Sequence, residues 1–161
     1  MNGEIDQATV MVVDDEEMIV SSIKGYLDLE TSYRVVTFTS AKEAVRYLES
    51  GAPVDLVISD YVMPGFNGID FLIQARRLQP AATRILLTGY TDKENAIRAI
   101  NEVGIFQYIE KPWENEELRL IIRNGLEKRF LLRKLEEKIR ALEGAKTDLE
   151  GVHQAILKAF I

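Results

Sequence analysis

The 161-residue chain is long enough for one domain with a full hydrophobic core and an added segment, and its lack of cysteine excludes disulfides and thiolate metal sites. No apolar run approaches the ~18 residues needed to span a membrane, and the N-terminus is acidic and polar and does not resemble a secretory signal, so we expect a cytoplasmic protein without membrane contact. Residues 1–113 carry 10 Lys and Arg against 17 Asp and Glu, a net charge of −7, which argues against nucleic acid as a direct partner and suits a hard divalent cation.

Strand-like and helix-like segments alternate along the chain. Short segments rich in β-branched residues predict strands at residues 9–13, 34–38, 56–60, 84–88 and 106–110. Apolar residues at helical spacing predict helices at residues 16–29, 40–50, 70–78 and 92–101, and a last helix from residue 114 onward. In the first helix the apolar residues at helical spacing are Met18, Ile19, Ile23, Tyr26 and Leu27. The expected inner faces carry Ala44, Val45 and Leu48 in the second helix and Ala96, Ile97 and Ile100 in the fourth. Ser40 with Glu43, and Glu114 with Glu117, have the spacing of a capping box.

This alternation predicts βαβ units and a parallel sheet covered by helices on both faces. Right-handed crossovers leave few topologies for five such units. The expected fold is α/β and flavodoxin-like, a doubly wound (βα)5 parallel sheet with strand order 2-1-3-4-5 and an extended C-terminal helix. Such sheets bind their ligands at the carboxyl ends of the strands.

Chemically active side chains follow four of the five predicted strands. Asp14 and Asp15 follow the first strand, Asp60 ends the third, Thr88 ends the fourth, and Lys111 follows the fifth. Because these ends lie on one edge of a parallel sheet, we expect three carboxylates, a hydroxyl and an ammonium group to converge. Clustered carboxylates repel one another unless a cation such as Mg²⁺ joins them. A carboxylate such as Asp60 can attack phosphorus while the metal and Lys111 neutralise the phosphoryl oxygens, so the set suits phosphoryl transfer.

Each of these residues also has a local interpretation. Asp60 could accept hydrogen bonds from its own loop, Asp14 could cap the following helix, Thr88 could serve as a β-branched strand residue, and Lys111 could pair with an acid. Local roles of this kind explain any one of these residues more easily than they explain the occurrence of all of them at strand ends.

Four motifs occur in order at these strand ends. They are Val12-Val13-Asp14-Asp15-Glu16, Ser59-Asp60-Tyr61-Val62-Met63-Pro64 followed by Asn67-Gly68, Leu87-Thr88-Gly89, and Tyr108-Ile109-Glu110-Lys111-Pro112. Together they resemble the signatures of the response-regulator receiver family, the CheY-like domains, over roughly residues 8–128, where we place a receiver domain. The resemblance implies a two-component signalling module, not an enzyme, that takes a phosphoryl group from a histidine kinase or a phosphotransfer protein.

The resemblance assigns the acceptor and metal-binding roles. It makes Asp60 the phosphorylated residue, with Asp15 and Asp60 binding Mg²⁺ through carboxylates, Asp14 through a water, and Val62 through its backbone carbonyl. Val62 and Tyr90 occupy two variable family positions that are polar in CheY. Here they are apolar and aromatic, which bears on how a water is placed for self-dephosphorylation.

The resemblance also implies a switch. Lys111 would contact the phosphoryl group and pair with Asp60 before phosphorylation, Thr88 would move toward the phosphoryl group, and Tyr108 would turn inward behind it. The Lys111–Pro112 bond is cis in the family. The residues alone favour Tyr108 as an aromatic strand residue packed on the sheet.

Beyond residue 128 an apolar seam continues without proline. The a positions of its heptads are Leu132, Ile139, Lys146, His153 and Phe160, and the d positions are Leu135, Leu142, Leu149 and Ile156. About four heptads predict a coiled-coil helix at residues 129–161, and Ile139 at a, Leu at d and Lys146 at a favour a parallel homodimer. Lys138 at g faces Glu143 at e of the partner, an attractive pair.

Three further expectations concern this helix. Gly125 and Lys128 fall on the seam near the domain, where we expect the helix to splay or bend. His153 is expected to be a seam or surface residue and neither a metal ligand nor a phosphodonor. The apolar end at residues 159–161 suggests that an output domain follows. The alternative is a single amphipathic helix folded back on its own domain.

Three other functions fit parts of the pattern. A haloacid-dehalogenase-type Mg²⁺-dependent phosphatase also uses a strand-end Asp, but it requires a second Asp where Val62 stands. A flavodoxin-like FMN binder needs a phosphate loop after the first strand, where Asp14 and Asp15 would repel phosphate. A receiver used as a phosphate-independent interaction module is opposed by the complete set of acids, Thr88 and Lys111.

Overall fold

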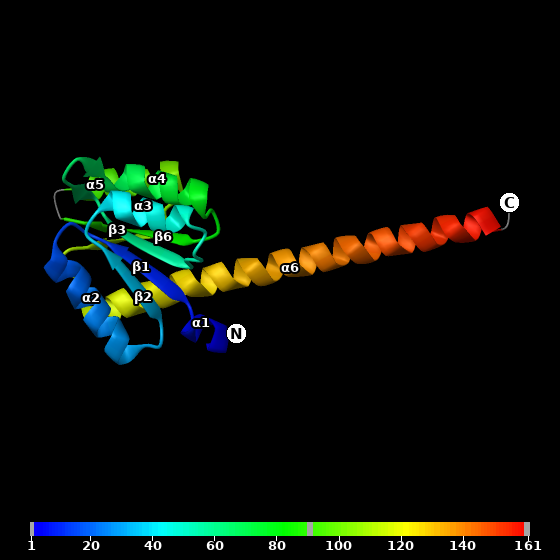
Figure 1. The fold of residues 1–161 in the computed structure, drawn as a ribbon, viewed down its shortest axis with the longest axis horizontal. Helices are drawn as coiled ribbons and strands as arrows, with labels where there is room; N and C mark the ends of the chain where they lie inside the picture. The colour runs from blue at the N-terminus through cyan, green and yellow to red at the C-terminus, as the bar shows by residue number, and fades with distance from the viewer. Residues whose placement is uncertain (1, 90–91, 160–161) are drawn as a thin grey trace. The chain divides into compact units, whose positions relative to one another are not determined.

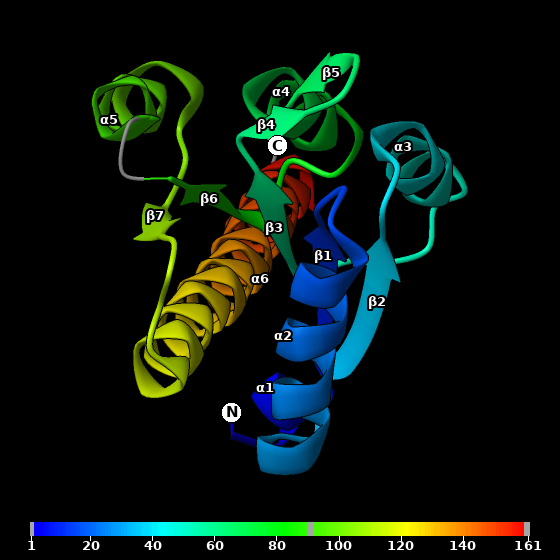
Figure 2. The same ribbon diagram turned by 90° about the vertical axis from the view of Figure 1, so that its left-hand side faces the viewer.

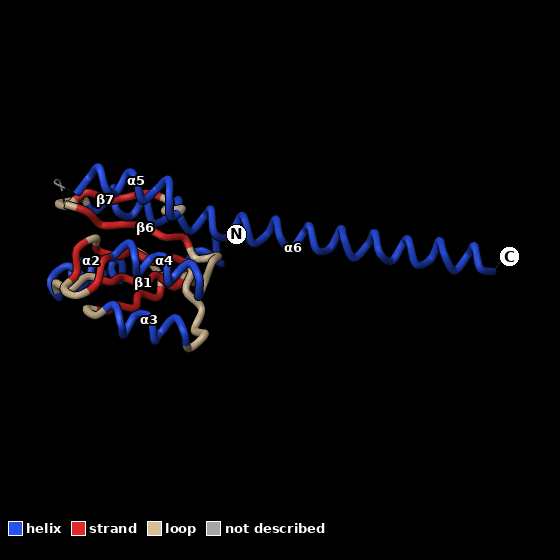
Figure 3. The backbone as a smooth tube through the Cα atoms, turned by 90° about the horizontal axis from the view of Figure 1, so that it is seen from above, coloured by secondary structure: helices blue, strands red, loops and turns tan. Residues whose placement is uncertain are grey.

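The computed structural model describes residues 2–89 and 92–159. The elements are α1 (Asn2–Asp6), β1 (Thr9–Val13), α2 (Glu17–Glu30), β2 (Arg34–Phe38), α3 (Ala41–Glu49), β3 (Leu56–Asp60), β4 (Val62–Met63), β5 (Phe66–Asn67), α4 (Gly68–Leu78), β6 (Thr83–Thr88), α5 (Lys93–Val103), β7 (Gln107–Glu110) and α6 (Asn115–Ala159). Helices and strands alternate as predicted from the periodicity of the sequence (Figure 3).

The main sheet has five parallel strands in the order β2-β1-β3-β6-β7. Counting only these five strands gives the order 2-1-3-4-5, which confirms the predicted flavodoxin-like topology. Every residue of β1 and β3 is buried, as expected of strands covered on both faces. Val13 of β1 pairs with Ser59 of β3, and Asp60 pairs with Leu87 of β6. The carboxyl ends of the three central strands therefore lie side by side.

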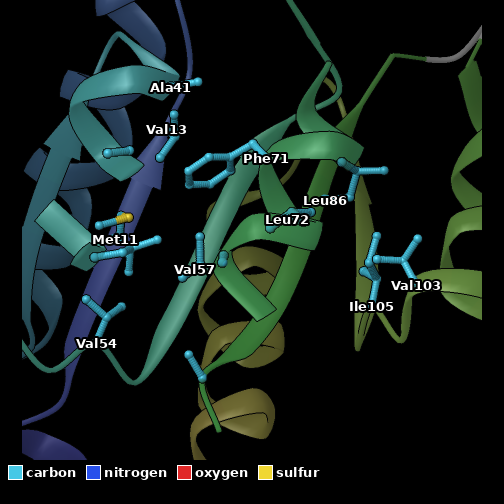
Figure 4. Packing of buried hydrophobic residues seen from close by; sticks show 14 of the residues in the cluster. Met11, Val13, Ala41, Val54, Val57, Phe71, Leu72, Leu86, Val103 and Ile105 are labelled. Carbon is cyan, nitrogen blue, oxygen red and sulfur yellow. The ribbon is translucent and has the colours of Figure 1, made fainter. Parts of the chain in front are cut away.

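Helices cover both faces of the sheet. Helices α3, α4 and α5 lie on one face, and α2 with the beginning of α6 lies on the other (Figures 1 and 2). Strand residues alternate between the two layers. Met11 and Leu86 belong to the cluster under α3, α4 and α5. In that cluster the Phe71 ring, carried by α4, points toward Val13 of β1 (Figure 4).

Two helices bury positions that differ from their predicted apolar patterns. The buried positions are Val20, Ile23 and Leu27 in α2 and Ala96, Ala99 and Val103 in α5. Ile97 is 46% exposed, so the prediction that it points inward is wrong, and Met18, which was counted in the helical period of α2, is 83% exposed. In both helices the buried positions are spaced by three and four residues. This single stripe excludes Met18 and Ile97, which lie on other sides of their helices.

Two elements have no counterpart in the prediction. Helix α1 is short and buries Ile5, which is 1% exposed. Strands β4 and β5 form an antiparallel hairpin between the predicted strand at residues 56–60 and the predicted helix at residues 70–78. Strands of two residues are too short to show a period of two in the sequence.

Helix α6 approaches the sheet closely at Gly125. The Thr83 hydroxyl donates a hydrogen bond of 2.8 Å to the Gly125 carbonyl oxygen. A Cβ atom at residue 125 would lie 2.9 Å from Leu56 Cδ1 and 3.0 Å from Thr83 Cγ2. Helix α6 is continuous at Gly125, and the glycine lets its backbone reach the sheet. The splaying or bending expected near Gly125 and Lys128 stays a prediction.

Two further contacts hold the same part of α6. The Lys128 ammonium lies 5.3 Å from the centroid of the Phe106 ring. Arg129 Nε lies 3.8 Å from Asp55 Oδ1, while Asp55 Oδ2 accepts a hydrogen bond of 2.9 Å from the Thr9 backbone N–H. Residues 125–129 thus contact the amino-terminal ends of the central strands and the loop before β7.

The chain divides into two compact units, Met1–Arg129 and Phe130–Ile161. The second unit contains the rest of α6, where the described apolar seam residues are 46 to 71% exposed. In the described part of the chain, no helix is both long and apolar enough to cross a membrane.

Candidate functional site

Three carboxylates meet at the carboxyl edge of the sheet. Asp14 directly follows β1 and is fully buried, and Asp60 ends β3 and is 7% exposed. Asp15 follows Asp14 and is exposed. One carboxylate oxygen from each residue lies within 4.8 Å of those from the other two. The predicted convergence results from the pairing of β1 with β3, which places their ends next to each other.

Asp14 is held at both of its carboxylate oxygens. Its Oδ1 accepts a hydrogen bond of 2.9 Å from the Glu16 backbone N–H, and its Oδ2 accepts one of 2.8 Å from Lys111 Nζ. The first bond is local to the loop after β1, and it coexists with the contact across the sheet. Asp14 does not cap α2, whose N-cap residue is Glu16. Asp14 is therefore both a loop-ordering residue and a member of the charged cluster.

Lys111 joins the carboxylates from the opposite side. It follows β7, and its backbone N–H donates to the Thr88 carbonyl at 2.8 Å. Its Nζ lies 2.8 Å from Asp14 Oδ2 and 3.0 Å from Asp60 Oδ1. The Lys111–Pro112 bond is cis, as the family resemblance implied.

The charges perturb one another. Burial raises the pKa of Asp60 above its ordinary value, and the negative charges of Asp14 and Asp15 add to this shift while the hydrogen bond from Lys111 opposes it. Burial alone would lower the pKa of Lys111, but its hydrogen bonds to Asp14 and Asp60 outweigh that effect and raise it. Three carboxylates thus share one ammonium group, and the cluster is short of positive charge.

Thr88 and Tyr108 lie on neighbouring strands beside the cluster. Thr88 is buried at the end of β6, and its hydroxyl donates to the Gly89 carbonyl at 3.2 Å. Tyr108 lies opposite Leu86 on β7 and is partly buried against the hydrophobic cluster. The tyrosine is therefore a packed strand residue in this conformation, with a side chain that is not fully enclosed.

Gly68 contacts the end of β3 at Asp60, and the sequence did not reveal this role. A Cβ atom at residue 68 would overlap the Asp60 carbonyl oxygen and lie 2.7 Å from its carbonyl carbon. The Gly68 N–H donates to the Tyr61 carbonyl at 2.8 Å, which closes the loop containing the hairpin. The Asn67-Gly68 pair was recognised only as part of a family motif, and no local signal shows that residue 68 packs on residue 60.

The loop after Asp60 leaves Val62 accessible. Val62 begins the β4–β5 hairpin and is 60% exposed. An apolar side chain thus lies two residues beyond the acceptor candidate, where it cannot donate a hydrogen bond to water. The other variable position, Tyr90, lies outside the described residues.

The residues present fit a hard divalent cation. All three side chains offer carboxylate oxygens, the ligand type that Mg²⁺ prefers, and their charge exceeds that of Lys111. The exposure of Asp15 leaves one side of the cluster open to water and to a phosphate oxygen. In the described part of the chain, this is the one group of acidic or histidine side chains close enough to hold a metal ion.

Comparisons with known proteins agree with this geometry. Residues 10–123 match the family described as the response regulator receiver domain. Over 121 residues the chain is 44% identical to the hydrogenase transcriptional regulatory protein HoxA of Cupriavidus necator, covering 75% of this chain and 24% of HoxA. It is 35% identical over 117 residues to the response regulator SaeR of Staphylococcus aureus, covering 73% of this chain and 50% of SaeR. The chain therefore spans from 24% to 50% of the length of these relatives.

A solved structure supports the same assignment. The crystal structure of a response regulator receiver domain protein from Clostridium thermocellum superposes with a TM-score of 0.72 at 36% sequence identity, covering 78% of this chain and 98% of that one. Fold, strand-end residues and sequence similarity agree over the same part of the chain. The chain belongs to the response regulator receiver family of two-component signalling systems.

Proposed function

We propose that this receiver accepts a phosphoryl group on Asp60 from a phosphohistidine of a histidine kinase or phosphotransfer protein. The observation that supports this most is the position of Asp60, whose carboxylate is 3.0 Å from Lys111 Nζ at the edge of the acidic cluster. In the reaction an Asp60 oxygen would form a bond to phosphorus as the bond from phosphorus to the histidine nitrogen breaks. The leaving imidazole then takes a proton from water. The chain is thereby a phosphoryl acceptor in a signalling pathway and not an enzyme.

Mg²⁺ is the cofactor that this proposal requires. Asp14, Asp15 and Asp60, with the backbone carbonyl of Val62, would hold it. When bound, the ion supplies the positive charge that stabilises phosphoryl oxygens during transfer. The chain's own part is to hold the carboxylates together, with Asp14 fixed by its bonds to Glu16 and Lys111.

The switch would act through three residues. Lys111 would exchange its contact with the Asp60 carboxylate for one with the phosphoryl group, while Asp14 remains its second partner. The Thr88 hydroxyl would leave the Gly89 carbonyl and donate to a phosphoryl oxygen. Tyr108 would then turn inward on β7, the strand next to β6.

The second part of the proposal concerns residues 129–161, which we assign to a helix that follows a receiver domain at residues 8–128. Its seam from Leu132 to Ile156 is exposed in one copy of the chain, and burying such side chains contributes roughly 1.5–3 kcal/mol each. A parallel homodimer would cover this seam, and the phosphorylation signal would pass along it to an output. The a position of Phe160 lies outside the described residues.

Phosphorylation can be tested with acetyl phosphate and MgCl₂. Intact-mass spectra should show one added phosphoryl group on the full chain and none on Asp60→Asn, because the amide is not a nucleophile. Asp28→Asn, which removes an exposed carboxylate on α2, is the matched control and should label normally. Adding EDTA should also prevent labelling. Equal labelling of Asp60→Asn and the parent chain would refute the assignment.

A further inference from the structure

A second surface lies beside the acidic cluster, between α3 and the β4–β5 hairpin. It consists of two adjoining hollows with volumes of about 300 Å³ and about 240 Å³. Lys42 of α3 and Phe66 of β5 line both hollows, so the two form one groove, here called the α3–hairpin groove. Figure 2 shows the hairpin next to α4, on the side of α3. Of the residues that line the groove, only Asp15 also belongs to the acidic cluster.

The floor of the groove is apolar. Phe66 is partly buried. Met63 lines the larger hollow, here called the inner hollow, and Val45 lines the smaller one, here called the outer hollow. An aromatic ring and two aliphatic side chains in a hollow can enclose an apolar side chain of a partner. Each hollow is at or below the lower end of the volumes typical of small-molecule sites, which favours single side chains of a peptide over a cofactor.

The wall of the groove carries unpaired positive charge. Lys42 and Arg46 are four residues apart on α3, so both lie on the same side of the helix, and both are exposed. Among the described residues, neither has a carboxylate within 4.0 Å. Glu49 lines the outer hollow but lies beyond that distance from Arg46. Two free cations on a body with an excess of acidic residues mark a surface complementary to a negatively charged partner.

The acidic residues at the two ends of the groove restrict how such a partner lies. Asp15 lines the inner hollow and Glu49 the outer one, so carboxylates of the partner are repelled from both ends. They are attracted to the middle, where Lys42 and Arg46 lie. A partner segment with one apolar residue between two acidic residues would place its carboxylates beside Lys42 and Arg46 and its apolar side chain over Phe66.

From this geometry we infer that the α3–hairpin groove binds an acidic peptide segment of a partner protein, with one apolar side chain over Phe66 and carboxylates on Lys42 and Arg46. The segment would lie beside the acidic cluster and leave Asp60 free. The inference is independent of phosphorylation, because no residue of the acceptor set except Asp15 lines the groove.

The test is a titration of the ¹⁵N-labelled full chain with a synthetic peptide, Glu-Glu-Phe-Glu-Glu, followed by amide chemical shifts. The amides of Lys42, Arg46 and Phe66 should shift. Lys42→Glu and Arg46→Glu should each weaken binding by about tenfold or more, since each replaces attraction with repulsion. Peptides with Gln for Glu or Ser for Phe should bind more weakly than the parent peptide.

Matched controls separate this site from general attraction of charge. Arg77→Glu and Arg98→Glu make the same change of charge at exposed positions that do not line the groove, and they should leave the affinity unchanged. Asp60→Asn should also bind normally, so a failure of the phosphorylation proposal would not affect this result. The inference is wrong if the peptide produces no shifts at the groove, or if the control variants lose as much affinity as Lys42→Glu.

Discussion

Gly68 is the residue whose replacement should most directly disturb Asp60, the proposed phosphoryl acceptor. An added methyl group would overlap the backbone carbonyl of Asp60, so Gly68→Ala must displace either the loop or the end of β3. We expect a loss of about 1–3 kcal/mol in the free energy of unfolding, as for overpacked cores. Because a displacement of about 1 Å can cost up to ~10²-fold in rate, labelling by acetyl phosphate should slow strongly.

Urea unfolding and the initial labelling rate measure these two effects. Gly25→Ala in α2 is the control, since no atom lies within 4 Å of the added Cβ. Alanine in a helix interior is about 1 kcal/mol more favourable than glycine, so Gly25→Ala should stabilise the chain and leave labelling unchanged. Unchanged stability and labelling of Gly68→Ala would show that the close contact with Asp60 affects neither the free energy of unfolding nor the labelling rate.

The raised pKa of Asp60 leads to a prediction about stability without metal. Its folded pKa lies above the unfolded value of about 3.9. Asp60 therefore contributes stability below that value, and this contribution is lost as the pH rises through the raised pKa. At neutral pH and in EDTA, Asp60→Asn should melt at a higher temperature than the parent chain, because it removes a buried charge beside Asp14 and Asp15.

This difference in melting temperature should shrink as the pH falls toward the ordinary range of aspartate, where the parent carboxyl group becomes protonated. Thermal unfolding from pH 7 down to pH 4 in EDTA measures it. A parent chain that is as stable as Asp60→Asn at neutral pH would contradict the destabilising effect assigned to the buried Asp60 charge beside Asp14 and Asp15. Saturating Mg²⁺ should raise the melting temperature of the parent chain above that of Asp60→Asn, since a ligand that binds the folded state stabilises it.

The site was more predictable from sequence than the contacts that hold it in place. Asp14, Asp60 and Lys111 follow strands that are recognisable from short β-branched segments, and parallel topology then brings strand ends together. Gly68 and the Glu16 bond to Asp14 depend on the path of loops, which no periodic pattern encodes. Thr88 was placed correctly at a strand end, but its bond to Gly89 depends on a rotamer that the sequence does not specify.

At the scale of secondary-structure elements, local signals predicted helix ends well. Ser40 accepts a hydrogen bond from the Glu43 N–H, as the capping box predicted. The helix predicted at residues 92–101 extends to Val103, and Gly104 follows it in the left-handed conformation, with φ of 74°. The hairpin and the faces of α2 and α5 were not predictable, because they depend on tertiary packing that overrides short patterns.

The contact of α6 with the sheet gives a prediction at this scale. Gly125→Ala gains helix propensity of about 1 kcal/mol but brings its Cβ to within 2.9 Å of Leu56 Cδ1. Because overpacking costs about 1–3 kcal/mol, we expect a net loss in the free energy of unfolding of the receiver. Gly144→Ala and Gly151→Ala are matched controls on the same helix, since nothing lies within 4 Å of either added Cβ, and both should increase helicity.

Thr83→Val tests the hydrogen bond separately from the steric contact. It keeps the shape of the side chain and removes the donor to the Gly125 carbonyl, which should cost about 1 kcal/mol. Thr83→Ser keeps the donor and should lose less unfolding free energy than Thr83→Val. Urea denaturation of both variants measures the difference. Equal stability of Thr83→Val and the parent chain would mean that the bond makes no net contribution.

At the scale of the whole molecule, the exposed seam of α6 predicts association. Leu142, at a d position, is 70% exposed in one copy of the chain. Leu142→Glu would place two charges opposite each other in a parallel dimer and should shift the chain to a monomer. Lys134→Glu, at an outer c position, changes the charge without touching the seam and should remain dimeric. Sedimentation equilibrium at tens of micromolar measures the association, and a parent chain that is monomeric there would exclude the proposed dimer.

The position of α6 at the end of the receiver has a consequence for synthesis of the chain. Thr83 and Gly125 are 42 residues apart, and the contact of Asp55 with Arg129 spans a still longer stretch. A growing chain therefore exposes Leu56 and the rest of that sheet face until residues near 130 have been made. The core of the receiver can therefore close only when the same continuous helix has formed whose later part we propose to recognise a second copy.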